Sequence, residues 1–595
     1  MNPAKWLQRF LIWRSRHVSK RNFLLLISVL IGIAAGLAST LLKWWVHFWE
    51  ELLIGINEDF SFEYLYLLFP VIGIALTILF VRFMNHGHLG KGISSIMHAI
   101  SHKSSILPRD MTYSHLVTSG LTVGFGGSVG LESPIVVTGS AIGSNLGMLF
   151  RFNYRERTLL IGCGVAAAIS SLFNAPIAGF VFTLEILLLE LAVSSFIPVL
   201  LASVAGAITT RALSGTEIIF TAEMTDSFEV AQLYLFMLLG AFTGIVSLVF
   251  IRISNRSRKI FANMKTTWHP FIAGSLMLGI LIFLFPALYG EGFTTIRALL
   301  SGNADFIVEQ SFFSKWVDGN ALLIPYILLL VVLKIVAANL TQGAGGNGGM
   351  FAPSLFVGAT AGYFFAQVLQ FTGLSGDLHM ATFTLVAMAG VLCGANHAPL
   401  TGVFFIAEIT SGYELMIPLV IVSTLSYITV KYFEPHPMPV RQLMEKGLFA
   451  GYDSDTRVIQ KLDVRKLIES EIRTIAPEIS LGELVEVVAN SSRNLFPVVD
   501  QSGVFQGIIT LDDIRTLMFK PERYNDTFAI QLMHAPPTVL QIQDGMDTAM
   551  KKFDETGAWN LPVLDGQQYV GIISKSRIFG MYRQLLASDT NRLDM

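Results

Sequence analysis

The chain has 595 residues, too many for one domain, and its composition is that of a polytopic membrane protein. Hydrophobic residues make up 52% of the sequence and charged residues only 14%. The formal net charge of −2 points to no particular partner, and nothing in the chain indicates nucleic-acid binding. The two cysteines, Cys163 and Cys393, lie in apolar segments, so a disulfide framework is excluded and we expect both thiols to be buried.

The first 21 residues form a basic segment. They carry six Lys and Arg side chains and no acidic one, so the positive-inside rule predicts that residues 1–21 are cytoplasmic. Uncharged runs follow at 22–42, 230–251 and 335–376, and about 20 apolar residues suffice to span a bilayer. We therefore expect residues 22–447 to form an all-α, multi-pass domain in contact with lipid, in the plasma (inner) membrane.

Two motifs occur twice in this hydrophobic region. Residues 126–134 read GGSVGLESP and residues 345–353 read GGNGGMFAP, with an offset of 219 residues. NAPIAGFVFTLEI at 174–186 is echoed 223 residues later by HAPLTGVFFIAEI at 397–409. A duplicated hydrophobic unit broken by Gly and Pro is typical of a transporter or channel whose ion site lies at the repeat interface. The two repeats are expected at about 22–215 and 230–447.

The GLESP segment at 130–134 has the composition of a helix start inside the membrane. Glycine allows a sharp backbone turn, and Pro134 suits a first helical turn. Such a helix directs unsatisfied N–H groups and the positive end of its dipole at one point, and GMFAP at 349–353 repeats the arrangement. Two converging helix N-termini predict an anion site without a fixed positive charge. Glu132 is a lone acid among apolar residues, so we expect it to be functional.

These segments resemble those of a known family. GLESP is similar to the GREGP signature of the CLC chloride channels and exchangers, GMFAP to their G-x-F-x-P motif, and LGKGIS at 89–94 to their GSGIP. The resemblance implies an inverted-repeat fold with broken, half-spanning helices, and a homodimer with one pore per subunit. It also implies that the Glu132 carboxylate is a gate, which occupies an anion position and swings away to let chloride pass. The residues expected to bind the anion are Lys91, Gly130, Leu131, Ser133, Gly349, Met350, Phe351 and Ala352.

Three positions depart from the family pattern. The signature serine falls at Lys91, which either adds positive charge to the inner vestibule or extends into cytoplasmic water and binds nothing. The tyrosine that closes the inner side falls at Pro439, so the inner gate is either wide or formed by another group. The inner glutamate of proton-coupled members falls at Ile186, which cannot titrate. Glu190, one helical turn beyond, is a candidate replacement.

The missing inner carboxylate and tyrosine favour a passive chloride channel. The alternative is a chloride/proton exchanger with a non-standard inner proton route, which would drive protons uphill when given a chloride gradient. Glu185 and Glu408 recur at equivalent repeat positions, so we expect them to satisfy backbone groups or helix ends and not to carry protons. Chloride is the expected anion by the resemblance alone.

After Gly447 the charged residues become frequent, and a further repeat appears. Residues 496–514 and 561–578 each predict a strand, a polar turn, a second strand and a helix. This α/β unit resembles a tandem pair of CBS domains, which we expect in the cytoplasm. The expected bounds are 448–466 for a linker, 467–525 for the first CBS domain and 526–595 for the second.

In the CBS family a Thr-x-x-Asp after the last strand holds the ribose of an adenine nucleotide. Thr510 and Asp513 fit this motif in the first copy, whereas the second copy has Ser574 and Arg577, so at most one site is competent. The pair is either a structural, dimerising module or a sensor of ATP or AMP. No other cofactor is expected.

Other classes of protein fit the sequence less well. A CBS-bearing cation transporter of the magnesium type would need oxygen-rich, acidic residues in the membrane, whereas the broken helices offer glycine amides and one acid. No nucleophile–base constellation indicates an enzyme, and no cluster of ligands indicates a metal site. His115 and His397, isolated in apolar segments, are expected to pack or to cap helices.

Overall fold

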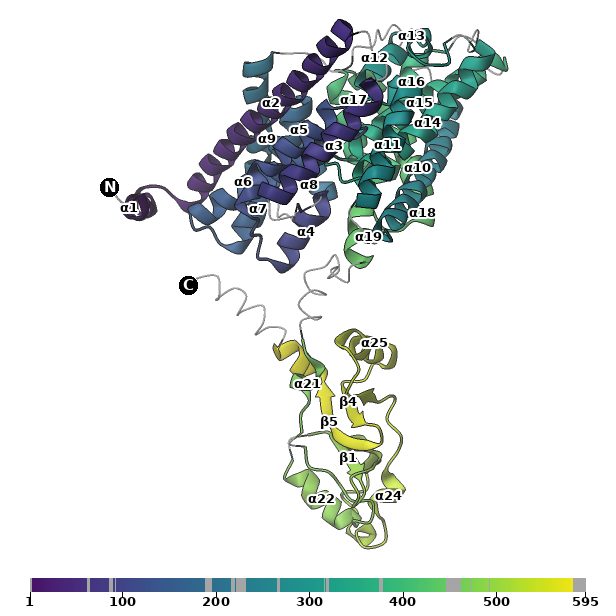
Figure 1. The fold of residues 1–595 in the computed structure, drawn as a ribbon. Coiled ribbons are helices and arrows are strands. Elements are labelled where there is room, and N and C mark those ends of the chain that lie inside the picture. Colours follow the sequence, from purple (N-terminus) through teal and green to yellow (C-terminus); the bar gives the residue numbers. More distant parts are fainter. Residues whose placement is uncertain are drawn as a thin grey trace. The chain divides into compact units, whose positions relative to one another are not determined.

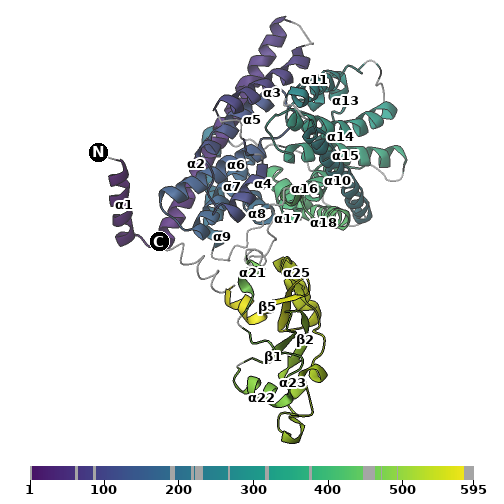
Figure 2. The same ribbon diagram turned by 60° about the horizontal axis from the view of Figure 1, so that its bottom comes forward.

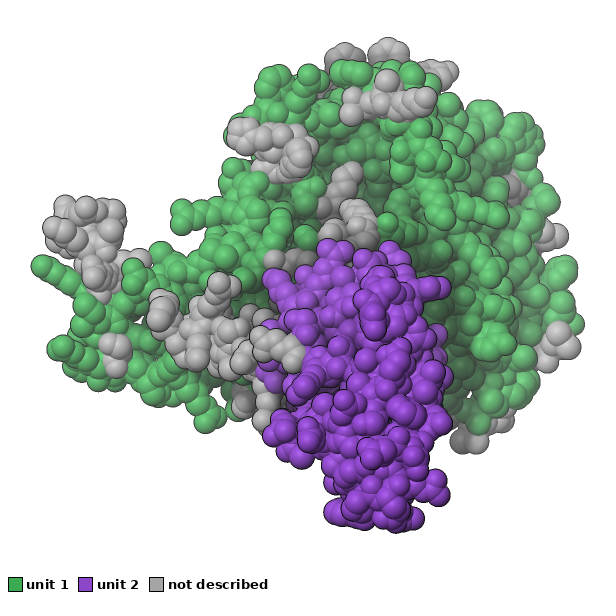
Figure 3. Space-filling model, turned by 90° about the horizontal axis from the view of Figure 1, so that it is seen from below, with its two compact units in different colours: residues 1–449 green, residues 450–595 purple. Residues whose placement is uncertain are grey.

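The chain forms two compact units, residues 1–449 and residues 450–595 (Figure 3). The regular structure of the first unit is helical, and the second unit contains helices and short strands, so the predicted fold class is confirmed. The computed structural model describes residues 3–60, 65–84, 89–90, 92–187, 195–215, 220, 232–264, 268–314, 316, 320–373, 378–445, 462–470, 472–491 and 493–581.

Helices from the two halves of the first unit form two neighbouring groups, purple to blue and teal to green in Figures 1 and 2. The first group contains α1 (Pro3–His17), α2 (Lys20–Phe60), α3 (Leu65–Met84), α4 (Gly92–His102), α5 (Ser114–Gly124), α6 (Glu132–Leu149), α7 (Tyr154–Phe173), α8 (Pro176–Ile186) and α9 (Phe196–Ser214). The second contains α10 (Leu233–Ala262), α11 (Trp268–Leu284), η4 (Pro286–Leu288), α12 (Phe293–Leu300), α13 (Asp305–Glu309), α14 (Asn320–Gly343), α15 (Phe351–Phe371), α16 (Met380–Asn396), α17 (Pro399–Ile409), α18 (Met416–Phe433) and α19 (Met438–Glu445).

Eight helical segments within the described residues are long and apolar enough to cross a membrane. Of the four shorter apolar helices, α8, α11, α16 and α17, the helices α8 and α17 have 11 residues each, the length of the expected half-spanning elements. The long segments differ in burial: 83% of the apolar window of α7 is buried, but only 28% of that of α3. Helices such as α7 therefore form the centre of the unit, and helices such as α3 present apolar side chains at its surface.

The NAP and HAP motifs mark the same chain reversal in both repeats. Helix α7 ends at Asn174 and α16 at His397, and both residues adopt left-handed backbone conformations, with φ of 55° and 57°. Pro176 and Pro399 then occupy the first positions of α8 and α17. A left-handed cap followed by proline ends one helix and starts the next, which explains why this pattern is duplicated.

The glutamates that end α8 and α17 cap each other's helices. Glu185 accepts hydrogen bonds from the Leu400 N–H at 2.9 Å and the Thr401 N–H at 2.7 Å, at the start of α17. Glu408 accepts hydrogen bonds from the Ile177 and Ala178 N–H groups at the start of α8, at 3.0 and 2.8 Å. The exchange satisfies orphan helix donors across the repeat interface. The prediction that Glu185 and Glu408 have structural roles is confirmed.

Glycines bring the central helices into backbone contact. A side chain at Gly139 of α6 would overlap with the Gly164 carbonyl of α7, and a side chain at Gly164 would overlap with the Gly139 carbonyl. Small residues at such positions allow the close helix packing on which membrane domains depend. Cys163 and Cys393 are buried and unpaired, as predicted.

The second unit contains two related strand pairs. Strand β1 (Leu495–Val499) pairs antiparallel with β2 (Phe505–Thr510), and β4 (Asn560–Asp565) pairs antiparallel with β5 (Gln568–Ser574). Both strand pairs were predicted. A short parallel strand, β3 (Leu540–Gln541), adds to β4. The helices are α21 (Val464–Leu467), α22 (Leu481–Ala489), α23 (Leu511–Ile514), α24 (Ala529–Leu532) and α25 (Met546–Thr556).

The segment before each strand pair contacts the other pair. Glu469 exchanges backbone hydrogen bonds with Ile572 of β5, and His534 does so with Ile508 of β2. Val464 and Leu467 are buried in one core with β4 and β5. The folded unit therefore begins before residue 467, within the expected linker, whose residues 448–461 lie outside the described part of the chain.

Candidate functional site

Glu132 occupies the first position of α6, and only 3% of its surface is exposed. Its Oε1 atom accepts a hydrogen bond of 2.7 Å from the Phe351 N–H, at the start of α15 in the other repeat. The Ala352 N–H makes a weaker interaction with the same carboxylate. Oε2 has no hydrogen-bond partner among the described residues. The carboxylate thus lies where two helix N-termini meet, a position suited to an anion.

The GLESP segment (130–134) and the GMFAP segment (349–353) pair with each other where α6 and α15 begin. The Gly130 N–H donates to the Gly349 carbonyl at 3.0 Å, and the Gly349 N–H donates to the Gly130 carbonyl at 2.7 Å. A side chain at either position would overlap with the Glu132 carboxylate, so glycine is required at both. Both N–H groups are engaged in this pairing. The pairing brings Glu132 to Phe351.

Of the other predicted anion-binding residues in these segments, three surround the Glu132 carboxylate and one, Leu131, binds a different acid. Met350 is the N-cap of α15, and Ala352 and Ser133 lie in the first turns of α15 and α6, around the carboxylate. Leu131, the N-cap of α6, differs from them. Its N–H donates to Oε1 of Glu291 at 3.1 Å, so this donor is directed at a second carboxylate.

The Phe351 side chain packs among three other phenylalanine rings. Its ring centroid lies 4.9 Å from that of Phe405 in α17, 5.8 Å from Phe173 in α7 and 6.0 Å from Phe182 in α8. This packing fixes the start of α15 against both repeats. The ring is therefore structural, while the backbone amide faces Glu132.

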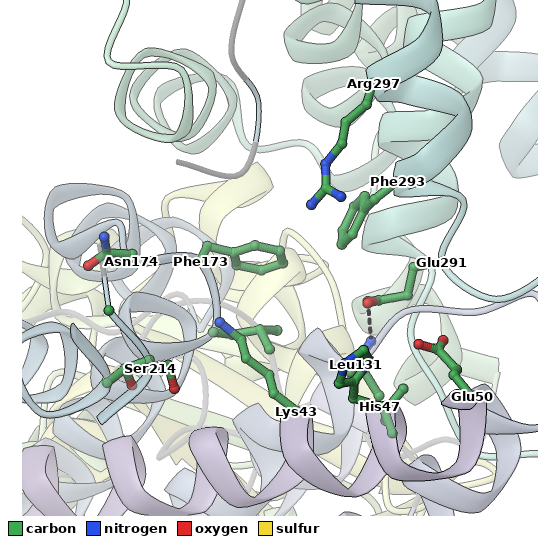
Figure 4. A pocket seen from close by; sticks show the side chains of 14 residues that line it. Lys43, His47, Glu50, Leu131, Phe173, Asn174, Ser214, Glu291, Phe293 and Arg297 are labelled. Carbon is green, nitrogen blue, oxygen red and sulfur yellow. Dashed lines mark hydrogen bonds between the residues drawn. The ribbon is translucent and has the colours of Figure 1, made fainter. Parts of the chain in front are cut away.

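A charged pocket opens beside the N-terminus of α6 (Figure 4). Its volume is about 290 Å³, and the backbone of Leu131 and the ring of Phe173 form part of its wall. Figure 4 shows the hydrogen bond between Leu131 and Glu291, with side chains of α2 below and Arg297 of α12 above. The charged and titratable side chains that line the pocket are Lys43, His47, Glu50, Glu291 and Arg297.

Lys334 is a fully buried cation behind this pocket. Its Nζ donates to the Gly290 carbonyl at 2.8 Å and to the Leu288 carbonyl at 3.4 Å. It also lies 4.9 Å from the ring centroid of Phe356 in α15, within the range of a cation–π interaction. The sequence motifs did not identify Lys334, Glu291 and Glu50 as candidate residues. The available signal was an ionisable side chain within an apolar run, which by default is functional.

Helix α4, which begins within the LGKGIS segment, contacts α19. Pro439 lies in the first turn of α19 and is half-buried, and the Ser94 hydroxyl of α4 donates to Gln442 of α19 at 3.2 Å. Ile186, the last residue of α8, is buried and apolar. Lys91 and Glu190 lie outside the described residues.

The two isolated histidines pack as expected. His115 is buried and lies 3.2 Å, through Nδ1, from the side-chain nitrogen of Asn347 in the second signature segment. His397 is the left-handed cap of α16. Both observations confirm the prediction. No group of metal-ligating side chains occurs in the described part of the chain.

In the second unit, Thr510 and Asp513 bond to each other. The Thr510 N–H and hydroxyl both donate to Oδ2 of Asp513 at 2.6 Å, and Nε2 of His534 lies 3.1 Å from the same oxygen. Partial burial raises the pKa of Asp513, but the bonds from Thr510 and the contact with His534 outweigh it and hold the pKa below its ordinary value. In the second copy, Ser574 donates to Glu469 instead, at 2.8 Å.

The family is settled by comparison with known proteins. The family model described as voltage gated chloride channel matches residues 72–431, and the CBS domain model matches residues 464–520 and 529–583. The chain belongs to the CLC voltage-gated chloride channel family. It is a multi-pass integral membrane protein of a family of chloride transporters and channels, which are not enzymes, and it carries a C-terminal pair of CBS domains. The resemblance read from the signature segments is confirmed.

Named relatives include both exchangers and channels. The H(+)/Cl(-) exchange transporter ClcA of Vibrio cholerae is 26% identical over 437 residues, 71% of this chain and 89% of the relative. The voltage-gated ClC-type chloride channel ClcB of Salmonella typhimurium is 28% identical over 302 residues, 48% of this chain and 68% of the relative. The crystal structure of a eukaryotic CLC transporter shares the fold, with a TM-score of 0.62 and 18% identity over 94% of this chain and 99% of that chain.

Proposed function

We propose that this CLC protein is a passive chloride channel gated by Glu132. The observation that carries the proposal is the hydrogen bond from the Phe351 N–H to the Glu132 carboxylate at the meeting point of α6 and α15. A carboxylate in that position mimics a bound anion, so chloride and the gate compete for the same donors. Backbone amides hold an anion without a full positive charge, which keeps binding weak enough for passage.

The inner side supports the absence of proton coupling. Exchange at a fixed stoichiometry ties each chloride passage to one protonation state of the gate, and in the usual exchanger scheme an inner carboxylate hands protons from the cytoplasm to the gate. Ile186 occupies the inner acid position, and Glu185 is engaged in capping α17. Pro439 replaces the tyrosine that would close the inner side. Chloride should therefore cross without an obligatory proton.

The second candidate is a chloride/proton exchanger. It is favoured by the presence of the titratable gate itself and by the relative that is named an exchanger. In this candidate, protons reach Glu132 from the inside through water or through Glu190.

Flux in liposomes separates the two candidates. Purified protein is reconstituted with a chloride gradient, and a pH electrode records external protons. We expect chloride to leave along its gradient with little or no counter-movement of protons. Sustained uphill proton movement that disappears in Glu132→Ala would overturn the channel proposal and establish the exchanger.

The wider assignment follows from the family. We propose a homodimer with one pore per subunit in the plasma (inner) membrane, with the N-terminus and the CBS pair in the cytoplasm. The CBS pair regulates the gate, and Thr510 with Asp513 forms its candidate site for ATP or AMP. Lys91 either adds positive charge to the inner vestibule or extends into cytoplasmic water.

A further inference from the structure

Glu291 is a second acid at the junction of the two repeats. It lies in the loop between η4 and α12, and its Oε1 accepts the Leu131 N–H at 3.1 Å. Leu131 is the N-cap of α6 and directly precedes Glu132. Each helix N-terminus at the junction is thus bonded to a carboxylate: that of α15 to Glu132, and that of α6 to Glu291.

The loop that carries Glu291 is held in place on both sides of it. Lys334 binds the Gly290 carbonyl ahead of it. Gly292 behind it adopts φ of +86°, and a side chain there would overlap with the Phe356 ring. Backbone fixed in this way presents the Glu291 carboxylate at a defined place. A flexible acid on the protein surface would not be held by contacts of this kind.

Glu291 faces the pocket of Figure 4, at the mouth of the junction. The ring of Phe23, near the start of α2, packs at 5.4 Å on Phe150, which follows the end of α6. Lys43, which lines the pocket, lies 23 residues after Lys20, or about 35 Å along α2. The pocket therefore opens on the side of the membrane opposite to the start of α2, which is the outer side when the N-terminus is cytoplasmic.

Several charges act on Glu291 there. Glu132 of α6 and Glu50 of α2 repel it, and Lys43 of α2 and Lys334 of α14 attract it. His47 of α2 and Arg297 of α12 line the same pocket. An anion that enters from this pocket meets the negative charge of Glu291 before it reaches the Glu132 position.

We propose that Glu291 is the outer acid of this anion pathway: its carboxylate holds the Leu131 N–H and repels entering anions until it is neutralised. The inference rests on the proposed function, in which anions pass the Glu132 position. It predicts two acids, and not one, behind the response of the current to outer pH. Protonation of either acid removes negative charge from the pathway, so the current rises as the outer pH falls.

Glu291→Gln is the informative variant, because it removes the charge and keeps an oxygen that accepts the Leu131 N–H. Currents are recorded in planar bilayers, with chloride and pH varied on one side at a time. We expect Glu291→Gln to lower the half-saturating chloride concentration on the pocket side by on the order of tenfold, as Coulomb repulsion is relieved. Glu51→Gln, an exposed acid on the same helix as Glu50 and paired with His47, is the matched control and should match the wild type.

The pH arm uses single and double variants. We expect the wild type to show one titrating step from the pocket side for Glu132 and one for Glu291, each single variant to lose its own step, and the double variant to lose both. Wild-type chloride dependence and two remaining steps in a folded Glu291→Gln would overturn the inference. An effect on chloride dependence that appears in Glu291→Ala but not in Glu291→Gln would also overturn the inference. It would mean that Glu291 only anchors the loop. Failure of the proposed function would look different from failure of this inference. If Glu132 were not the gate, Glu132→Ala would keep the wild-type current and both titrating steps.

Discussion

Removal of the Glu132 carboxylate should open the pathway and remove the gate's part of its dependence on pH. In the structure the Glu132 carboxyl group is buried and bonded at 2.7 Å to the Phe351 N–H. A hydrogen bond to a charged group contributes about 1.5–3 kcal/mol net. Since every 1.4 kcal/mol is about a factor of ten, loss of this bond should shift the gate towards its open state by roughly ten- to a hundredfold.

The assay compares chloride efflux from liposomes containing wild type, Glu132→Gln and Glu132→Ala between pH 4 and 8. We expect flux to rise in both variants and to lose the gate's part of the pH response, because neither variant carries a charge at residue 132 that competes with chloride for the Phe351 N–H. Glu309→Gln, an exposed acid of α13, controls for the loss of a negative charge. A folded Glu132 variant with wild-type flux and a wild-type pH profile would refute the gate assignment.

Three further outcomes follow. Glu185→Gln and Glu408→Gln should each lower the free energy of unfolding in detergent by about 1–3 kcal/mol, because both acids cap helices. Neither variant should change proton movement in liposomes, and altered proton movement would contradict this role. Gly164→Val should lower the yield and the melting temperature, since its side chain meets the backbone of α6, whereas Gly55→Ala, with open space around it, should not. Asp513→Ala should reduce ATP or AMP binding to residues 448–595 in calorimetry, and equal affinity would eliminate the site. Because the folded pKa of Asp513 is lowered, its contribution to stability is present above about pH 4 and lost as the pH falls through the folded pKa.

The junction of α6 and α15 was predictable because its determinants are local. Gly130 and Pro134 specify a turn and a helix start, and the second copy at 349–353 places an equivalent start in the other repeat. The NAP and HAP motifs similarly predict a helix end followed by a helix start. Duplication then implies that the equivalent elements meet at the repeat interface.

The partners of these elements were not predictable from the same patterns. Leu131 and Glu291 are 160 residues apart, and no periodicity links the η4–α12 loop to the start of α6. The mutual pairing of the Gly130 and Gly349 backbones likewise depends on tertiary structure and could not be predicted from the two segments alone. Such contacts are decided by how the repeats dock and leave no local signature.

The most direct test is the position of a heavy halide in crystals of the wild type and of Glu132→Gln soaked in bromide. If chloride and the gate compete for the same donors, Glu132→Gln should show anomalous density within hydrogen-bonding distance of the Phe351 N–H. The wild type should show the carboxylate there and no bromide. Bromide bound to Phe351 in the wild type alongside the carboxylate, or absent from this position in a folded Glu132→Gln crystal, would contradict the account.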